Sequence, residues 1–163
     1  MTEVRREAGP GAKNLEVLLK GMKGLQGQVG WFPSAVYPDG TPVAYVATIQ
    51  EFGAPAQKIP PRSFMRTTIV EKQQEWHKLA ESGSRAILAG NATPELVMDA
   101  ICLKAQEDVA EKITQIYEPP LRPATIAARL RRRADKKTVG ALDKPLIDSG
   151  HMLSTISSQV SQK

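Results

Sequence analysis

Histidine, serine and carboxylate side chains are the residues of this 163-residue chain whose chemistry could serve catalysis or metal binding. Its two histidines, His77 and His151, each lack a second ligand at a metal-binding spacing such as i+4. Ser149 follows Asp148, but the flanking glycines and strand-to-helix context of a nucleophile elbow are absent. No glycine-rich phosphate loop is present either. The sequence therefore predicts no catalytic, cofactor-binding or metal-binding residue, and a protein that is not an enzyme.

A basic run is the second feature with a chemical use, in a chain whose net charge is +5. Its members are Arg129, Arg131, Arg132, Arg133, Lys136 and Lys137. Such a run suits the phosphates of nucleic acid, an acidic face on a neighbouring subunit, or solvent alone. Aromatic residues make up only 5% of the chain, which argues against a surface that stacks bases. An acidic partner is favoured, while DNA contact and a solvated loop stay open.

Two charges flank a proline-rich segment at residues 53–61. Glu51 and Arg62 are able to pair across the base of this loop, and Gly53 allows a turn that a residue with a Cβ would resist. The alternative is that Glu51 is a solvated charge at a strand end. Phe64 is expected to enter the core as the next helix begins, with a contact to a neighbouring subunit as its less favoured role.

The elements that must position these residues begin with a flexible tail over residues 1–12. A helix is predicted from Asn14, as N-cap, to Gly24. Residues 28–32 and 42–52 are predicted to form a hairpin, because apolar residues alternate along the second segment and turn residues lie between the two.

Three further helices are predicted: one over residues 62–89, one from Thr93 onward, and one over residues 123–133. The second of these is expected to bury one apolar stripe, which comprises Leu96, Ala100, Leu103, Ala110, Ile113 and Tyr117. Asp148 is expected to cap a turn at residues 150–153, and residues 156–160 to form a closing strand.

The predicted fold class is α+β, with a small antiparallel sheet, built from the hairpin and the C-terminal strand, packed against the N-terminal helix and the long central helices. One domain is expected over residues 13–163, with mobile loops near 33–41, 53–61 and 129–144. No apolar run is long enough for a bilayer and no secretion signal is apparent, so no membrane partner and synthesis in a cytoplasm are expected. The single cysteine, Cys102, is expected as a small core side chain.

Two patches of the chain resemble a family of tailed-bacteriophage proteins. The first patch is Ile49-Gln50-Glu51-Phe52-Gly53 followed by Ile59-Pro60-Pro61-Arg62-Ser63-Phe64-Met65. The second is Pro120-Leu121-Arg122-Pro123-Ala124-Thr125-Ile126, then Lys144-Pro145-Leu146-Ile147-Asp148-Ser149-Gly150-His151-Met152-Leu153 and Ser154-Thr155-Ile156. The family comprises head-tail joining, neck, tail-completion or virion morphogenesis proteins and is similar to the lambda minor tail protein Z.

The resemblance implies which residues carry the family motif: Glu51, Phe52, Gly53, Pro61, Arg62, Phe64, Asp148, Ser149 and Gly150. This chain departs from the family pattern where Ser63 replaces a proline and Ser149 a threonine. Both changes keep the local chemistry, since serine starts helices and caps turns.

The function that the resemblance implies is structural. It implies a virion protein that forms a ring in the neck or upper tail, completes the tail, joins it to the DNA-filled head and keeps the channel continuous for genome ejection. Six copies are the first expectation and twelve the next. The implied neighbours are head-closure or connector proteins and tail tube or terminator proteins, with non-specific contact to genomic DNA in the channel. The alternative from another class is a basic nucleic-acid-binding accessory protein.

Overall fold

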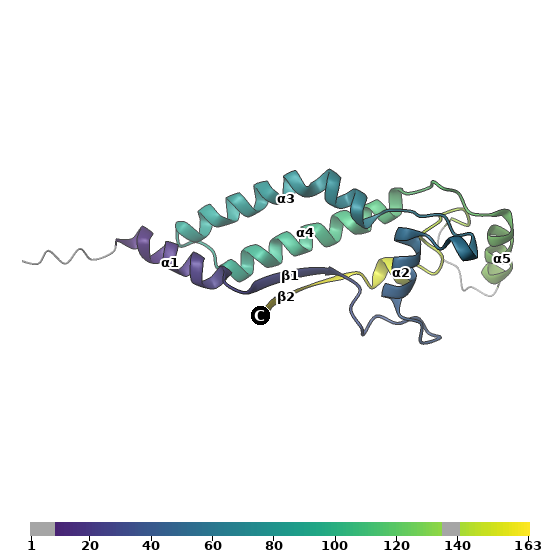
Figure 1. Ribbon diagram of the computed structural model, residues 1–163, viewed down its shortest axis with the longest axis horizontal. Coiled ribbons are helices and arrows are strands. Elements are labelled where there is room, and N and C mark those ends of the chain that lie inside the picture. Colours follow the sequence, from purple (N-terminus) through teal and green to yellow (C-terminus); the bar gives the residue numbers. More distant parts are fainter. Residues whose placement is uncertain (1–8, 135–140) are drawn as a thin grey trace, which may run out of the picture. The chain divides into compact units, whose positions relative to one another are not determined.

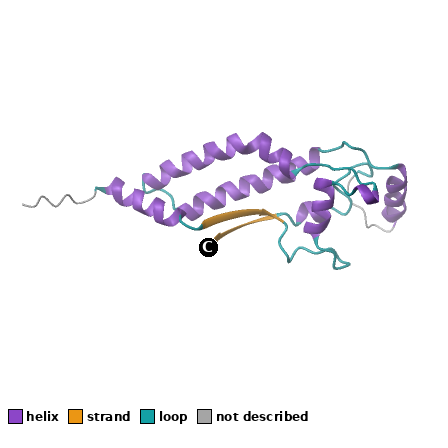
Figure 2. Ribbon diagram, in the orientation of Figure 1, coloured by secondary structure: helices purple, strands orange, loops and turns teal. Residues whose placement is uncertain are grey.

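The computed structural model describes residues 9–134 and 141–163. The elements follow one another as α1 (Pro10–Met22), β1 (Leu25–Gly30), α2 (Val43–Phe52), a 3-10 turn η1 (Pro55–Gln57), α3 (Met65–Leu88), α4 (Pro94–Gln115), α5 (Pro123–Ala134), α6 (His151–Ser154) and β2 (Ser157–Gln162) (Figure 1). Helices and one two-stranded antiparallel sheet, β1 with β2, make up the regular structure described (Figure 2). The predicted α+β class is confirmed.

By its internal contacts the chain divides into two compact units. The first unit comprises the described part of Met1–Gln28 together with Gln74–Lys104 and Ser158–Lys163. The second comprises Val29–Gln73 and the described part of Ala105–Ser157. The expected single domain over residues 13–163 stays a prediction. Of the expected tail, residues 1–8 lie outside the described residues, and residues 10–12 belong to α1.

The predicted hairpin is wrong, because residues 43–52 form the helix α2. Alternating apolar residues suggested a strand there, yet Val43, Ala47 and Glu51 are the buried positions, spaced four apart as on one helical face. Pro42 precedes the helix and Gly53, with φ of 77°, ends it. Packing in the core overrides the β-propensity of this segment. The C-terminal strand is confirmed as β2, and its partner is β1 alone.

Helix α1 starts at Pro10, four residues before the predicted cap. Proline suits the first helical position because its missing N–H would have no partner there. Asn14 lies inside the helix, where its side-chain amide donates a hydrogen bond to the carbonyl of Leu88 (2.9 Å). The helix ends at Met22, and Gly24 follows with φ of 78°, as the sequence predicts.

The long helices α3 and α4 and the shorter α5 are confirmed near their predicted bounds. Thr93 caps α4, since its Oγ1 accepts a hydrogen bond from the Leu96 N–H (3.3 Å). The predicted buried stripe of α4 is largely wrong. Leu96, Ala100, Leu103 and Tyr117 are exposed, and the buried positions are Pro94, Cys102, Ala105, Asp108, Val109 and Ile113. Apolar residues lie on two faces of α4, so periodicity alone does not choose the one that faces the core.

Glycines set the close contacts within the first unit. A Cβ built on Gly83 of α3 would lie 2.3 Å from Val97 Cγ1 on α4, and one on Gly21 of α1 would lie 2.5 Å from Pro94 Cγ. A Cβ on Gly27 of β1 would lie 2.3 Å from the sulfur of Cys102. Backbone and side chains therefore approach more closely at these three points than any larger residue allows.

The second unit holds a continuous apolar core. Its buried members are Val43, Ala47, Phe64, Val109, Ile113, Leu146, Met152 and Ile156. Trp31 packs edge-on against Phe64, with ring centroids 5.7 Å apart, and its indole N–H donates a hydrogen bond to the carbonyl of Met152 (2.8 Å). This core joins α2, the start of α3, the end of α4 and the segment around α6. Within the described residues, no helix combines the length and hydrophobicity that a bilayer crossing requires.

Candidate functional site

Glu51 at the end of α2 is a buried carboxylate that holds the start of α3. Its oxygens accept hydrogen bonds from the Ser63 hydroxyl (2.7 Å), the Met65 N–H (2.8 Å) and the Arg66 side chain (2.8 Å). The first N–H groups of a helix have no partner within it, and a negative charge there also meets the positive end of the helix dipole. Burial pushes the pKa of Glu51 up, but the hydrogen bonds from Arg66, Ser63 and the two backbone amides outweigh it and hold the pKa below its ordinary value.

The predicted pair between Glu51 and Arg62 is wrong, and so is the solvated alternative. The cation beside Glu51 is Arg66, the second residue of α3, which the sequence analysis did not single out. The guanidinium of Arg66 also lies over the ring of Phe52, 4.6 Å from its centroid. Phe52 is otherwise exposed. One sequence feature could have identified Arg66 as the partner of Glu51. It lies in the first turn of a helix, and a loop separates that helix from the acidic residue.

Arg62 has a different role, because it holds a second loop. Its Nε donates to the carbonyl of Pro119 (2.8 Å) and its Nη2 to the carbonyl of Pro120 (3.1 Å). A further bond, from Nη1, reaches the side chain of Gln50 (3.2 Å). Burial, and then the positive charge of Arg129, lowers the pKa of Arg62, which still stays charged because an arginine titrates far above neutrality.

The remaining residues of the first patch shape the backbone. Gly53 adopts φ of 77°, and a Cβ there would lie 2.8 Å from the backbone nitrogen of Pro61. Only glycine combines this left-handed conformation with such a close neighbour. Phe64 is 1% exposed, so its predicted place in the core is confirmed and a contact with a neighbouring subunit is not open to it.

Arg129 and Asp148 form the centre of the second patch. Arg129 on α5 is buried and donates hydrogen bonds to the carbonyls of Leu142, Lys144, Ile147 and Pro145. The carboxylate of Asp148 lies 3.5 Å from Arg129 Nε and 2.8 Å from Arg132 Nη2. Asp148 therefore anchors its loop to α5, and the prediction that it caps the following turn is wrong. Ser149 takes part in that turn instead, since its Oγ accepts the N–H of His151 (3.3 Å) and Gly150 adopts φ of 77°.

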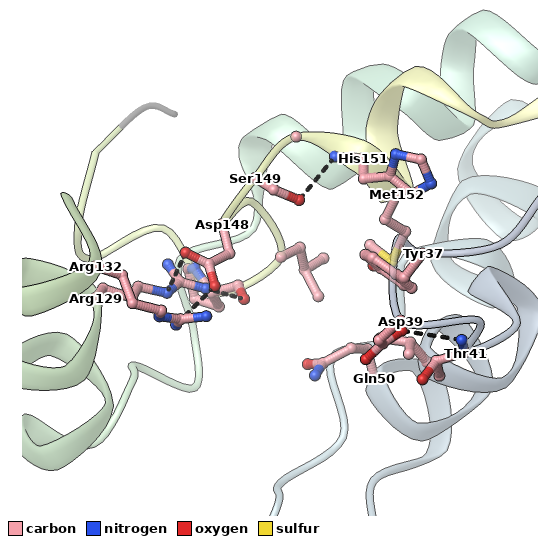
Figure 3. Close-up of a pocket in the computed structure, with 14 residues that line it drawn as sticks. Tyr37, Asp39, Thr41, Gln50, Arg129, Arg132, Asp148, Ser149, His151 and Met152 are labelled. Carbon is pink, nitrogen blue, oxygen red and sulfur yellow. Dashed lines mark hydrogen bonds and ion pairs between the residues drawn. The ribbon is translucent and has the colours of Figure 1, made fainter. Parts of the chain in front are cut away.

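A pocket of about 380 Å³ opens beside this ion pair. In Figure 3, Arg129, Arg132 and Asp148 point toward one another on one side, and Tyr37 and His151 lie on another. The imidazole of His151 contacts the carbonyl of Val36 (2.8 Å) through Nε2, which must carry a proton to make this hydrogen bond. Its ring packs on Tyr37 with centroids 4.9 Å apart.

Asp39, Asp148 and His151, three polar residues of this pocket, have partners that belong to the fold. Burial raises the pKa of Tyr37, and the charges of Asp148 and Asp39 raise it further, so its hydroxyl stays protonated near neutrality. Asp148 faces two guanidinium groups, and His151 fixes a backbone carbonyl. These interactions join the loop at residues 36–41 and α5 to the segment before α6. The arrangement is that of a structural junction.

The chain matches no family model, no curated protein and no solved structure. The phage-family resemblance of the two patches therefore stays a prediction. The geometry adds one physical fact to it: the charged residues of both patches, Glu51, Arg62 and Asp148, bind parts of this chain.

The members of the predicted basic run lie in different surroundings. Arg129 is only 5% exposed and is occupied by four carbonyls, so its assignment as a DNA or partner contact is wrong. Arg131 is exposed, and Arg132 is half-exposed while paired with Asp148. The side chain of Arg133 and the residues Lys136 and Lys137 lie outside the described residues. The sequence did not distinguish Arg129 from its neighbours, because a charged run is usually a solvated face.

Proposed function

We propose that the chain is a structural virion protein that forms a ring in the neck or upper tail of a tailed phage and joins the tail to the DNA-filled head. The proposal starts from the resemblance of the two patches to the joining and tail-completion family. It contains no catalytic step: the protein acts by providing surfaces for its own copies and for neighbouring head-closure and tail proteins.

One observation carries most weight in support of the proposal. The two patches are far apart in the sequence, yet they bind each other directly within the second unit. Arg62 from the first patch holds the carbonyl of Pro120 in the second, and Arg122 from the second donates to the carbonyl of Lys58 beside the first (2.8 Å). Active sites direct charged groups toward a ligand, whereas these charges hold backbone. Charged side chains that hold backbone in this way suit a rigid building block.

A ring places a specific demand on the surface of the chain. Each copy must offer one patch that docks onto a different patch of the next copy, with a rotation that closes. In the proposed assembly, six copies surround the channel through which DNA passes. The loops at residues 33–41, 53–61 and 129–144 are the candidates for this contact between copies, and residues 135–140 of the third lie outside the described residues.

Deletion of the gene from its phage tests the proposal. We expect lysates of the deletion mutant to contain DNA-filled heads and separate tails by negative-stain electron microscopy, with infectivity restored by the wild-type gene on a plasmid. Immunogold labelling of complemented particles should mark the neck or upper tail. Intact, joined and infectious particles from the deletion mutant would overturn the proposal.

A further inference from the structure

A groove of about 670 Å³ lies in the second unit, between the loop at residues 53–61 and the segment that leads into α5. Apolar side chains from both segments make up half of the residues that line it: Pro55, Ile59, Pro60, Pro61, Pro120 and Leu121. We call this cavity the proline groove. Its size and apolar lining suit a few side chains of a bound segment.

The charged residues that line the proline groove are all basic. They are Lys58, Arg62 and Arg122. Glu51 and Glu118 precede the two segments in the sequence but do not line the groove, and the carboxylate of Glu51 is occupied at the start of α3. Lys58 and Arg122 are exposed, and no carboxylate of residues 9–134 and 141–163 pairs with either of them. The groove therefore carries an uncompensated positive charge.

Arg62 is a buried cation whose partners are neutral. It is 4% exposed, and its guanidinium donates to the carbonyls of Pro119 and Pro120 and to the side chain of Gln50. After burial, the further cause that lowers its pKa is the charge of a second cation, Arg129. A buried charge is costly unless an opposite charge lies near it. An anion in the groove would provide that opposite charge.

The backbone of the groove leaves little for main-chain recognition. Proline has no N–H, so four lining residues offer no backbone donor: Pro55, Pro60, Pro61 and Pro120. The N–H groups of Lys58, Ile59 and Arg62 are bonded to carbonyls of this same unit. A partner that adds a strand needs free main-chain groups, so recognition at this groove depends on side chains.

The chain itself does not provide an acidic segment for the groove of another copy. Outside the helices, the carboxylates of the described residues are isolated from one another: Asp39, Glu118, Asp143 and Asp148. Asp148 is paired with Arg132, and Asp143 is followed by Lys144. Residues 1–8 contain two glutamates and two arginines, whose charges cancel. A second copy is therefore a poor match to the charge of the groove.

We propose that the proline groove binds an extended segment of a different protein, rich in both acidic and apolar residues. Its carboxylates would meet Lys58 and Arg122, and its apolar side chains would pack on the prolines. Nucleic acid fits less well, because it binds mainly through phosphates and would leave the apolar half of the lining without a contact. The inference rests on the proposed function in one respect, that the segment belongs to a neighbouring head-closure or tail protein. The loop at residues 53–61 then serves this contact and not one between copies.

Fluorescence anisotropy with the full chain tests the inference, and the probe is a labelled peptide that alternates glutamate with leucine. We expect a Kd of about 100 µM or tighter at about 50 mM salt, which weakens as the salt rises to about 300 mM. Lys58→Glu should weaken binding at least about fivefold, because an attractive charge becomes a repulsive one. Lys78→Glu is the matched control, since Lys78 is exposed on α3, outside the groove. It changes the net charge equally and should alter the Kd by less than about twofold.

Both substituted lysines are exposed, so each variant should keep the circular dichroism and unfolding midpoint of the wild type. Two further peptides separate the contributions of charge and apolar contact. One alternates glutamine with leucine and the other alternates glutamate with serine. Each should bind at least about tenfold more weakly than the first peptide, because each lacks one of the two kinds of contact.

Three results would overturn the inference. The first is no binding of the glutamate-leucine peptide up to about 1 mM, a range that covers even weak complexes. The second is an equal loss of affinity in Lys58→Glu and Lys78→Glu, which would show attraction by net charge alone. The third is tighter binding of single-stranded DNA of the same length that Lys58→Glu abolishes, because it would assign the groove to nucleic acid.

The peptide measurements and the gene deletion fail independently. If the groove binds the peptide as expected while the deletion mutant still gives joined, infectious particles, the proposed function fails and the preference of the groove for acidic segments stands. If the deletion gives separate heads and tails while the peptide does not bind, the inference fails and the proposed function stands.

Discussion

Glu51 concentrates several interactions around the start of α3. Its carboxylate accepts hydrogen bonds from Ser63, Met65 and Arg66 while only 5% of the residue is exposed. A buried charge destabilises a fold unless its partners are close and well directed. Here the partners come from the helix that the carboxylate starts, so a single residue couples α2 to α3.

The substitution Glu51→Gln tests this role of the carboxylate, and the pH dependence of the unfolding free energy tests it a second time. The variant should lose about 2–3 kcal/mol of unfolding free energy at neutral pH, because an amide is uncharged and its NH₂ group faces donors. The hydrogen bonds to the carboxylate lower the pKa of Glu51 in the folded chain, so its stabilisation is present above the pKa of the unfolded chain and is lost as the pH falls through the lowered pKa. The difference between wild type and variant, measured by denaturant unfolding from about pH 7 to about pH 3, should therefore shrink below about pH 4.5.

Glu118→Gln is the control for this experiment, since Glu118 is exposed and its substitution should change stability by less than about 0.5 kcal/mol. A Glu51→Gln protein as stable as the wild type at neutral pH would contradict the role assigned to the carboxylate.

For single residues, the sequence predicts which side chains are buried better than it predicts which charged side chains pair with each other. Phe64 and Gly53 were placed correctly, because an aromatic at a helix start and a glycine beside a proline-rich loop have few other uses. Glu51 was assigned the wrong arginine, and Arg129 was assigned to a surface that meets an acidic partner, DNA or solvent, although it is buried. Which of several arginines reaches a given carboxylate depends on how the loops close in three dimensions, and chain spacing does not contain that information.

Among the elements, the long helices and the C-terminal strand were predicted well, whereas the predicted hairpin was wrong because its second segment is the helix α2. Caps and breakers defined α3, α4 and α5, since Thr93, Gly90 and the prolines after α4 act locally. In α2, Val43, Tyr45, Ala47 and Ile49 fit a strand as well as a helix, and burial of Val43 and Ala47 in the core decided the outcome. Short apolar segments are ambiguous by period alone.

Substitution of Gly83 tests how closely α3 packs against α4. Its substitution by alanine adds a methyl group that would lie 2.3 Å from Val97 Cγ1, and a valine in a helix has little freedom to move its side chain. We expect Gly83→Ala to lower the unfolding free energy by about 1–3 kcal/mol, although alanine favours the helix itself by about 1 kcal/mol. Thermal and denaturant unfolding measure the change.

Gly11→Ala, in α1, is the matched control, because a Cβ there meets no atom within 4 Å. It should be neutral or slightly stabilising. The double substitution Gly83→Ala with Val97→Ala should recover part of the loss by removing the methyl groups in the way. Equal stability of Gly83→Ala and the wild type would show that the close approach is not needed.

On the scale of the whole molecule, fewer basic side chains are available to bind DNA than the net charge of +5 and the basic run suggest. Arg129 is occupied by backbone carbonyls, and Arg132 is paired with Asp148. Exposed Arg131 is the member of the run that the described residues leave unoccupied. Non-specific binding of duplex DNA draws its strength from several simultaneous phosphate contacts.

A gel-shift series across salt concentrations therefore tests the accessory-protein alternative. At about 150 mM salt we expect the isolated chain to bind duplex DNA with a Kd weaker than about 1 µM, the range of non-specific contact. Replacing Arg131, Lys136 and Lys137 by glutamine should then reduce the salt dependence of log K by at most about 0.9 for each phosphate that these side chains neutralise in the wild type. Glutamine at Lys58, Lys78 and Arg85 removes equal charge elsewhere and serves as the control. Submicromolar binding that the first triple variant abolishes and the second retains would favour a nucleic-acid-binding protein, because net charge alone would affect both variants alike.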